Sequence, residues 1–227
     1  MSDISYSSQI RIAWKENWKH TSFRFHFLFT LALILGLTQF FPLYFDYLEA
    51  RNGTMLNDVV LNLIPAHDVS MLVFFFLYTG VFICFLANLI HPRFLVVAFQ
   101  TYAFVTIMRI VSLYFIHLDP PTGYICLREP VISQFFSTNG AICSKDLFFS
   151  GHVSSILSIY FSVNHKKFKT LLLICVVMIS LFVMIQHVHY TIDVIAAYPF
   201  TWLCYRFSKK LVLKSDLTSS GNPIQKS

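Results

Sequence analysis

Six apolar runs, each long enough to cross a bilayer, follow one another through most of this 227-residue chain. A transmembrane helix needs roughly 17–25 predominantly apolar residues, and its backbone polar groups must be satisfied within the helix itself. The pattern predicts an all-α, polytopic membrane protein with six transmembrane helices at Phe23–Phe45, Val69–Ile90, Phe94–Leu118, Leu147–Val163, Phe168–Gln186 and Thr191–Phe207.

Composition supports the membrane class. Hydrophobic residues make up 56% of the chain and charged residues 12%, whereas soluble domains average roughly 45–50% and 25%. No Gly/Pro/Ser-rich linker and no internal repeat divides the sequence, so we expect one bundle. The predicted organisation is an N-terminal cytoplasmic arm at 1–22, a six-helix membrane domain at 23–207 and a polar cytoplasmic tail at 208–227.

Lysine and arginine predict the orientation of this bundle. With six spans, thirteen of the 17 basic residues fall on the side that carries both termini, three fall on the other side, and Arg109 lies inside a span. By the positive-inside rule, both termini are cytoplasmic. The net charge of +6 is then a consequence of membrane topology and does not call for a nucleic acid partner.

The N-terminal arm contains two tryptophans one helical turn apart, Trp14 and Trp18, among Arg11, Lys15 and Lys19. This pattern suits a short interfacial helix on an anionic leaflet, and it equally suits an ordinary positive flank of the first span. No small-residue cleavage site follows an early apolar core, so we predict no removable signal peptide.

Two polar islands interrupt the apolar second half of the chain, and the predicted topology places both at the outer, exoplasmic face. The first is Ser150-Gly151-His152, and the second runs from His189 to Asp193. On a helix, residues four apart share a face, so Asp193 can orient one ring nitrogen of His189 and leave the other to attack phosphorus. The pair could also be purely structural, but an ionised Asp within a span is costly unless it is paired or hydrated.

Phosphate-binding candidates lie near these islands. Ser150 and Gly151 precede a helix start, where free N–H groups attract phosphate, although Ser-Gly is also an ordinary N-cap. Arg109 inside a span should point to an anion, with an internal carboxylate partner or snorkelling to the interface as the alternatives. Tyr114, five residues later, is expected near the same mouth.

Two cysteines are candidates for a cross-link, and two histidines are candidates for a metal site. Cys126 and Cys143 both fall in the predicted outer loop, where an oxidising compartment would favour a disulfide; two free cysteines are the alternative. Paired C-x-x-C motifs are absent from the sequence, and His187 with His189 alone is weak support for zinc, so no metal and no cofactor are predicted.

Two segments resemble a known family. Residues 143 to 152 read C-S-K-D-L-F-F-S-G-H, and residues 187 to 198 read H-V-H-Y-T-I-D-V-I-A-A-Y. They are similar to the signature blocks of the sphingomyelin synthase and ceramide phosphoethanolamine synthase family, a branch of the type 2 phosphatidic acid phosphatase (PAP2) superfamily. The segment from Arg109 to Pro121 resembles the third-helix block of this family more loosely. Two departures lie near the headgroup position: the C-G-D pattern is one residue longer here, and Val188 stands where relatives have an acidic residue.

The resemblance implies a PAP2-like bundle with an outward-facing His-His-Asp triad. In this reading His189 is the nucleophile, Asp193 orients it, and His152 protonates the leaving alcohol. Asp146 matches an acidic position of the first block, and Tyr190 belongs to the second block and is placed at the substrate. The predicted activity transfers a phosphocholine- or phosphoethanolamine-type headgroup through a phospho-histidine intermediate.

The expected donor is a glycerophospholipid of the bilayer, and the expected acceptor is ceramide, diacylglycerol or a similar lipid alcohol. Two other function classes stay open: a lipid phosphatase or phosphodiesterase with water as acceptor, and a catalytically silent lipid-binding or scaffold protein. Phe182-Val183 replaces the S-R pair of the hydrolytic phosphatases, which favours the transferase. No G-x-x-x-G motif marks a helix-pairing face, so the oligomeric state is unconstrained.

Overall fold

The computed structural model describes residues 5–128 and 144–219, and within these ranges the chain is helical. Its helices are α1 (Tyr6–Lys19), α2 (Thr21–Glu49), η1 (Leu61–Leu63), α3 (Ser70–Asn88), α4 (Pro92–Phe115), α6 (Gly151–Ser162), α7 (Lys166–Ile185) and α8 (Thr191–Ser219). The described residues contain no β-strand, only an isolated bridge between Thr54 and Leu118. The predicted all-α class is therefore confirmed for this part of the chain.

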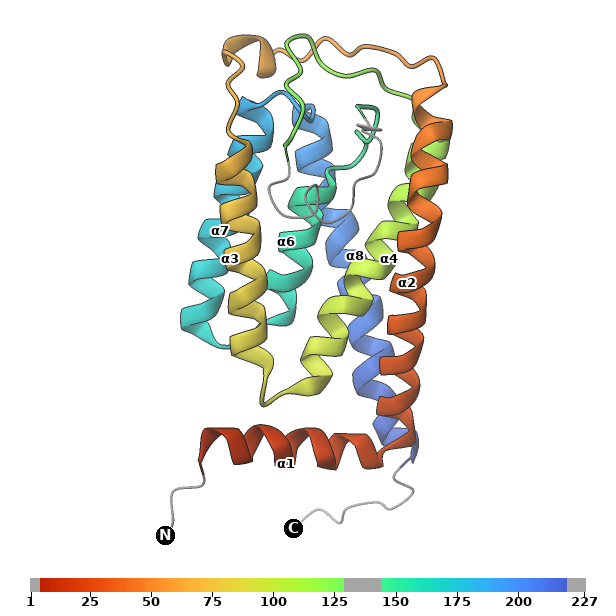
Figure 1. Ribbon diagram of the computed structural model, residues 1–227, viewed down its shortest axis with the longest axis vertical. Coiled ribbons are helices and arrows are strands. Elements are labelled where there is room, and N and C mark those ends of the chain that lie inside the picture. Colours follow the sequence, from red (N-terminus) through yellow and green to blue (C-terminus); the bar gives the residue numbers. More distant parts are fainter. Residues whose placement is uncertain (1–4, 129–143, 220–227) are drawn as a thin grey trace.

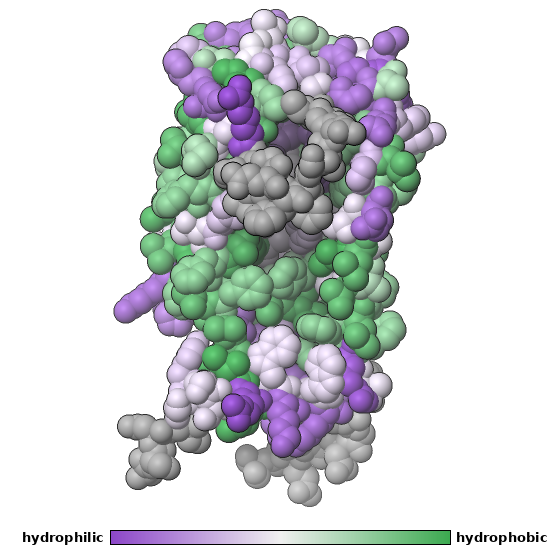
Figure 2. All heavy atoms as spheres, viewed as in Figure 1, coloured by the Kyte–Doolittle hydropathy of each residue, from purple (hydrophilic) through white to green (hydrophobic). Residues whose placement is uncertain are grey.

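Six helices stand side by side as a bundle, and α1 lies across one end of it (Figure 1). The α3–α4 and α6–α7 turns and the last turns of α8 lie at the α1 end, whereas α6 and α8 both begin toward the opposite end. On the face shown in Figure 2, hydrophobic residues gather over the middle of the bundle, and hydrophilic residues lie toward both ends. This distribution is the one that a bilayer requires of a spanning protein.

Four helices, α2, α3, α4 and α7, are long and apolar enough to cross a membrane. Each of the six predicted runs corresponds to one helix, but α6 has 12 residues and is about 18 Å long at 1.5 Å per residue, short of the roughly 30 Å hydrocarbon core. The long helix α8 carries Asp193 in its first turn and Arg206, Lys209 and Lys210 further on. The structure thus supports four candidate spans, and the count of six stays a prediction.

Two helix boundaries differ from the sequence prediction. The fourth run was expected from Leu147, but α6 begins only at Gly151, because Ser150 is its N-cap and its side chain accepts a bond from the Val153 N–H. The last run was expected to end at Phe207, but α8 continues to Ser219. In this extension Val212 packs with Phe23 of α2, so the added turns have an apolar face to bury.

The core is centred on α6, whose Val153, Ile156 and Leu157 are essentially inaccessible to solvent. A close approach between α3 and α6 depends on Gly80, because a Cβ atom there would overlap the side chain of Ile156. Although α6 is short, it is enclosed by other helices and not by lipid. This enclosure sets the position of its N-terminus.

The loops at the opposite end from α1 are held together by the segment between α7 and α8. Gln186 donates to Ser70 Oγ at 2.7 Å and accepts from the Val69 N–H at 3.1 Å. The two ring nitrogens of His187 lie 2.7 and 2.8 Å from the carbonyl oxygens of Thr122 and Ile64. These bonds fix the chain immediately before His189.

Candidate active site

The starts of α6 and α8 are joined directly by their backbones. The Ser150 N–H donates to the Asp193 carbonyl oxygen at 3.1 Å. Ser150 is fully buried and caps α6, with its Oγ 3.4 Å from the Val153 nitrogen. The two polar islands, which are about 40 residues apart in the sequence, therefore meet at one end of the bundle.

His152, His189 and Asp193 form a compact cluster there. His189 Nδ1 lies 3.5 Å from Asp193 Oδ2, and both side chains are almost completely buried. The rings of His152 and His189 have centroids 6.2 Å apart and planes inclined by 60°. Phe74 of α3 packs edge-on against His152 at 5.9 Å and fixes the outer side of that ring.

The His189–Asp193 pairing arises differently from the sequence prediction. The prediction placed both residues on one helical face, but α8 begins at Thr191 and His189 precedes it. Asp193 is the third helical residue, and its Oδ2 accepts the Tyr190 N–H at 3.0 Å, which is the backward half of a capping box. The same carboxylate therefore caps the helix and faces the histidine, near the positive end of the helix dipole.

A second carboxylate, Asp58 of the α2–α3 loop, also caps α8. Its Oδ2 accepts the Thr191 N–H at 2.6 Å, and its Oδ1 accepts the Thr191 hydroxyl at 3.0 Å. Burial alone would raise the pKa of Asp58, but the N–H groups of Thr191, Leu61 and Val60 stabilise the carboxylate and hold its pKa below the ordinary value. Asp58 is therefore ionised at neutral pH and anchors the start of α8.

Arg109 reaches from α4 to the N-terminus of α6. Its Nε donates to the Phe149 carbonyl oxygen at 2.8 Å, and its Nη2 forms an ion pair with Asp146 Oδ1 at 2.5 Å. The guanidinium also lies against Gly151, where a Cβ atom would overlap Nη1 and Cζ. The internal carboxylate, one of the alternatives considered for Arg109, is thus present, and it lies at the predicted phosphate site.

Asp146 remains a carboxylate beside Arg109. Burial favours its neutral acid, but the charge and hydrogen bond of the Arg109 guanidinium outweigh burial, so the pKa of Asp146 lies below its ordinary value. The segment before Asp146 is held by Glu49, the last residue of α2, which accepts bonds from the backbone N–H groups of Ser144 and Lys145. Glu49 therefore fixes the loop that presents Asp146 to Arg109.

Several buried polar atoms of the cluster have no hydrogen-bond partner among the described residues, although His189 Nδ1 lies 3.5 Å from Asp193 Oδ2. Within the described part of the chain, His152 Nδ1, His189 Nδ1 and Asp193 Oδ1 are buried and lack a hydrogen-bond partner. Such atoms are rare in folded proteins, and each one calls for an explanation. Together with Arg109 and the N-terminus of α6, they form a concentrated set of groups suited to a phosphate ester.

Two predicted site residues have other surroundings. Tyr190 is buried, and its hydroxyl donates to the Asp119 carbonyl oxygen at 2.8 Å and accepts the Leu56 N–H at 3.1 Å, so it holds two loops together. Tyr114 is exposed and its ring faces Arg51, because five residues along α4 turn it away from the face of Arg109. Substrate contacts by these tyrosines stay predictions without structural support.

The predicted Cys126–Cys143 disulfide stays a prediction as well. Cys126 is half-buried, with its Sγ 3.5 Å from the Leu127 carbonyl oxygen, and Cys143 lies outside the described residues. For metals, the described residues contain no group of three or more His, Cys, Asp or Glu side chains placed to hold an ion.

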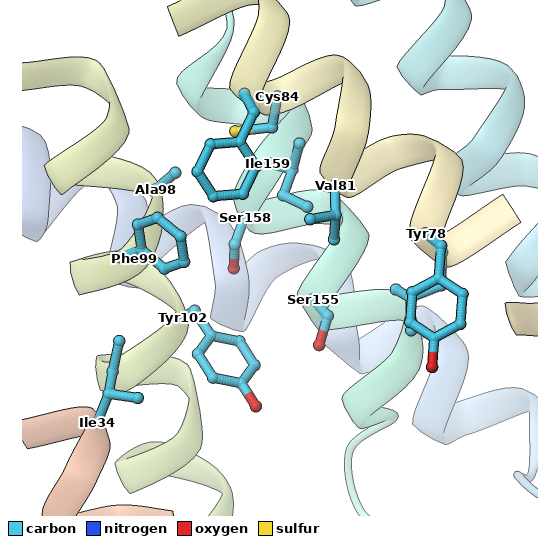
Figure 3. Close-up of a pocket in the computed structure, with 12 residues that line it drawn as sticks. Ile34, Tyr78, Val81, Cys84, Ala98, Phe99, Tyr102, Ser155, Ser158 and Ile159 are labelled. Atoms are coloured by element: carbon cyan, nitrogen blue, oxygen red, sulfur yellow. The ribbon is translucent and has the colours of Figure 1, made fainter. Parts of the chain in front are cut away.

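An apolar pocket of about 290 Å³ lies between α2, α3, α4 and α6, and its lining includes no residue of the cluster (Figure 3). Ser155, one turn after His152, and Ser158 face it from α6, and Tyr78 and Tyr102 face it from α3 and α4. Phe74 contacts both the Tyr78 ring, at 6.0 Å, and the His152 ring, which connects the pocket wall to the cluster. The other residues that line the pocket are apolar, which suits a lipid chain.

Sequence reasoning missed the residues that support this site. Asp58, Glu49, Phe74, Gln186 and His187 contact the cluster or the segments that carry it. Asp58 and Glu49 offered one signal, because they are acidic residues in a predicted outer loop. Their partners are more than 90 residues away, so no local pattern could identify them.

The fold and the cluster together describe a helical membrane protein with a His-His-Asp site at one end of its bundle. Residues 143–210 match the family model described as PAP2 superfamily C-terminal. The match covers less than a third of the chain and includes His152, His189 and Asp193, and it supports a PAP2-like protein. Members of this superfamily are typically lipid phosphatases or phosphotransferases. Searches of curated proteins and of solved structures found no match.

Proposed function

We propose that this protein is a phospholipid headgroup transferase that moves a phosphocholine- or phosphoethanolamine-type group from a glycerophospholipid to ceramide or a similar lipid alcohol. One observation carries the proposal: the centroids of the His152 and His189 rings lie 6.2 Å apart, and Asp193 Oδ2 lies 3.5 Å from His189 Nδ1. Two imidazoles on either side of one phosphorus can supply the nucleophile and the acid of a covalent phosphoryl transfer.

In the first step, neutral His189 attacks phosphorus through Nε2 while Asp193 faces Nδ1. A P–N bond forms, the P–O bond to diacylglycerol breaks, and protonated His152 donates its proton to the leaving oxygen. Asp193 stabilises the imidazolium that develops on His189. The products of this step are diacylglycerol and a phospho-histidine that keeps the ester bond to the headgroup.

In the second step, His152 is neutral and takes the proton of the acceptor hydroxyl. The acceptor oxygen attacks phosphorus, the P–N bond breaks, and His189 leaves as neutral imidazole. Arg109 and the N–H groups at the start of α6 stabilise the phosphoryl oxygens in both steps. Arg109 Nη2 and Asp146 Oδ1 lie 2.5 Å apart. Arg109 must therefore share its positive charge between Asp146 and the substrate phosphate.

The apolar pocket supports a lipid substrate. It adjoins His152 through Phe74 and Ser155, and its hydrocarbon lining suits an acyl or alkyl chain while the phosphate occupies the cluster. A soluble phosphate monoester would leave this surface without a partner. The substitution of Phe182-Val183 for the S-R pair of the phosphatases also favours transfer over hydrolysis.

The second candidate is a lipid phosphatase or phosphodiesterase with water in the second step. The match to the PAP2 superfamily favours it as much as it favours a transferase, because both activities occur there. A silent lipid-binding or scaffold protein is disfavoured because all three members of the triad are present.

Reconstituted protein tests the candidates directly. Liposomes would contain headgroup-labelled phosphatidylcholine or phosphatidylethanolamine, with and without ceramide, and the labelled product would be identified. A sphingophospholipid formed only with ceramide supports the transferase, and a free headgroup phosphate formed in both cases identifies the hydrolase. No diacylglycerol release from either donor would contradict both enzymatic readings. His189→Ala protein serves as the matched control in every arm.

A further inference from the structure

Helix α1 is amphipathic and lies across the end of the bundle that is remote from the catalytic cluster (Figure 1). Its half-buried residues, Ile10, Ala13, Trp14 and Asn17, follow the spacing of one helical face. Two bonds hold this face to the α3–α4 turn: Trp14 Nε1 donates to the Leu89 carbonyl oxygen at 3.0 Å, and Arg93 Nε donates to Asn17 Oδ1 at 2.5 Å.

Trp14, Lys15, Trp18 and Lys19 line a shallow groove on α1. The rings of both tryptophans contact Phe27 of α2 edge-on, at 6.2 and 5.3 Å, so the aromatic wall of the groove continues onto the first span. Trp18 is 42% exposed despite these contacts. A large aromatic side chain thus remains exposed at the α1 end of the bundle.

The charges beside this aromatic wall are positive and available. Lys15 is exposed, and Lys19 is bound to Glu16 at 2.7 Å in a pair whose two side chains are about 60% exposed. An exposed pair of this kind contributes little and exchanges readily for another anion. On the face shown in Figure 2, hydrophilic residues at this end adjoin the hydrophobic residues over the middle of the bundle.

We propose that α1 and the start of α2 form a binding site for an anionic phospholipid of the adjacent leaflet. Lys15 and Lys19 bind the headgroup phosphate, and Trp14 and Trp18 contact the glycerol backbone and the upper part of the chains. Indole rings favour this depth of a bilayer, and basic side chains beside it attract anionic lipid. The proposal concerns a surface away from the catalytic cluster and does not depend on the proposed function.

Fluorescence of the two tryptophans can be used to detect lipid bound at this site. The chain has three, and replacing Trp202 by phenylalanine leaves Trp14 and Trp18 as the only indoles. The full chain with Trp202→Phe is reconstituted in phosphatidylcholine vesicles that contain a minor fraction of brominated lipid. In one set of vesicles this lipid is brominated phosphatidylglycerol, and in the other set it is the same fraction of brominated phosphatidylcholine. We expect stronger quenching by the anionic lipid, reflecting an enrichment of about fivefold for each lysine engaged, and a loss of this preference at high salt.

Charge-matched variants test which lysines are responsible. Lys15→Gln with Lys19→Gln should abolish the preference, whereas Lys166→Gln with Lys167→Gln, which removes the same charge at the start of α7, should preserve it. Quenching by brominated phosphatidylcholine should persist in every variant and shows that α1 is still at the bilayer. Equal quenching by the two brominated lipids in the parent protein would overturn the proposal, as would a preference that survives in the Lys15/Lys19 variant.

Discussion

The guanidinium of Arg109 lies against the backbone of Gly151, so closely that a Cβ atom on Gly151 would overlap Nη1 and Cζ. This contact joins α4 to the first turn of α6, which carries His152. A side chain at position 151 must therefore displace either the arginine or the helix start. Glycine is needed here for close approach and not for an unusual backbone conformation.

Gly151→Ala should lower the rate of lipid turnover by about 100-fold, the cost of displacing a reacting group by about 1 Å. The control is Gly36→Ala on α2, where a Cβ atom would meet no other atom within 4 Å. Activity is measured in liposomes after both variants are shown to be folded and inserted. Normal turnover by Gly151→Ala would mean that Arg109 has no fixed role in the reaction.

The three members of the triad should differ in what they abolish. His189→Ala should eliminate both the phospho-enzyme and turnover. His152→Ala should stop turnover with natural lipids. It should still allow slow phosphorylation of the protein by a nitrophenyl phosphodiester, because that leaving group needs no proton. Asp193→Asn should reduce the rate by about 10⁴-fold. Acid-quenched labelling of the protein separates the two steps, and near-normal activity of His189→Ala would refute the covalent mechanism.

The Arg109–Asp146 pair gives a pH-dependent prediction. Asp146→Asn leaves a buried guanidinium without its carboxylate and should lower the free energy of unfolding by about 3 kcal/mol at neutral pH. The pKa of Asp146 in the folded protein lies below its ordinary value of 3.8. The stabilisation from the ion pair is therefore fully present above pH 3.8, and it disappears as the pH falls through the lower pKa of the folded protein.

The measurement for this pair is thermal unfolding of wild type and variant in detergent between pH 7 and pH 3. The difference between the two proteins should be constant down to about pH 5 and shrink only in the most acidic samples. A difference that already vanishes near pH 6 would show that another group dominates the stability of this region.

Asp58 is predicted to act through α8 and not on the substrate. Asp58→Asn should cost about 1 kcal/mol of stability, as the loss of a helix cap does, and it should slow turnover because Asp193 lies in the same first turn. The control is Asp46→Asn, an exposed acidic residue on α2. If Asp58→Asn leaves the rate unchanged while unfolding more easily, the cap contributes to stability alone.

Topology is tested by labelling single cysteines introduced at two exposed loop positions. A cysteine at Asn57 should react with an impermeant thiol reagent added outside intact cells, and a cysteine at Asn164 should react only after the membrane is opened, because the charge bias places these loops on opposite sides. Unmodified protein measures the reactivity of the native cysteines. The reverse pattern would place the cluster of His152, His189 and Asp193 on the cytoplasmic side.

Much of this architecture could be predicted from sequence because hydropathy and charge act locally. An apolar run must form a helix in lipid whatever surrounds it, and basic loops indicate its orientation, so the helices could be predicted before any packing was known. The same reasoning brought Ser150, His152 and Asp193 to one end of the bundle. It also identified the start of α6, since an N-cap serine acts on its own first turn.

Tertiary structure decided what depends on partners far along the chain. Hydropathy predicted α6 as a full span, and packing shows a 12-residue helix enclosed by its neighbours. Three contacts could not be predicted: the partners of Arg109, the cap that Asp58 provides across 133 residues, and the bonds from Glu49. Such contacts follow from how the helices pack, and the neighbouring residues in the sequence do not reveal them. The sequence by itself therefore determined the membrane class and the chemical groups, and packing determined which of those groups face one another.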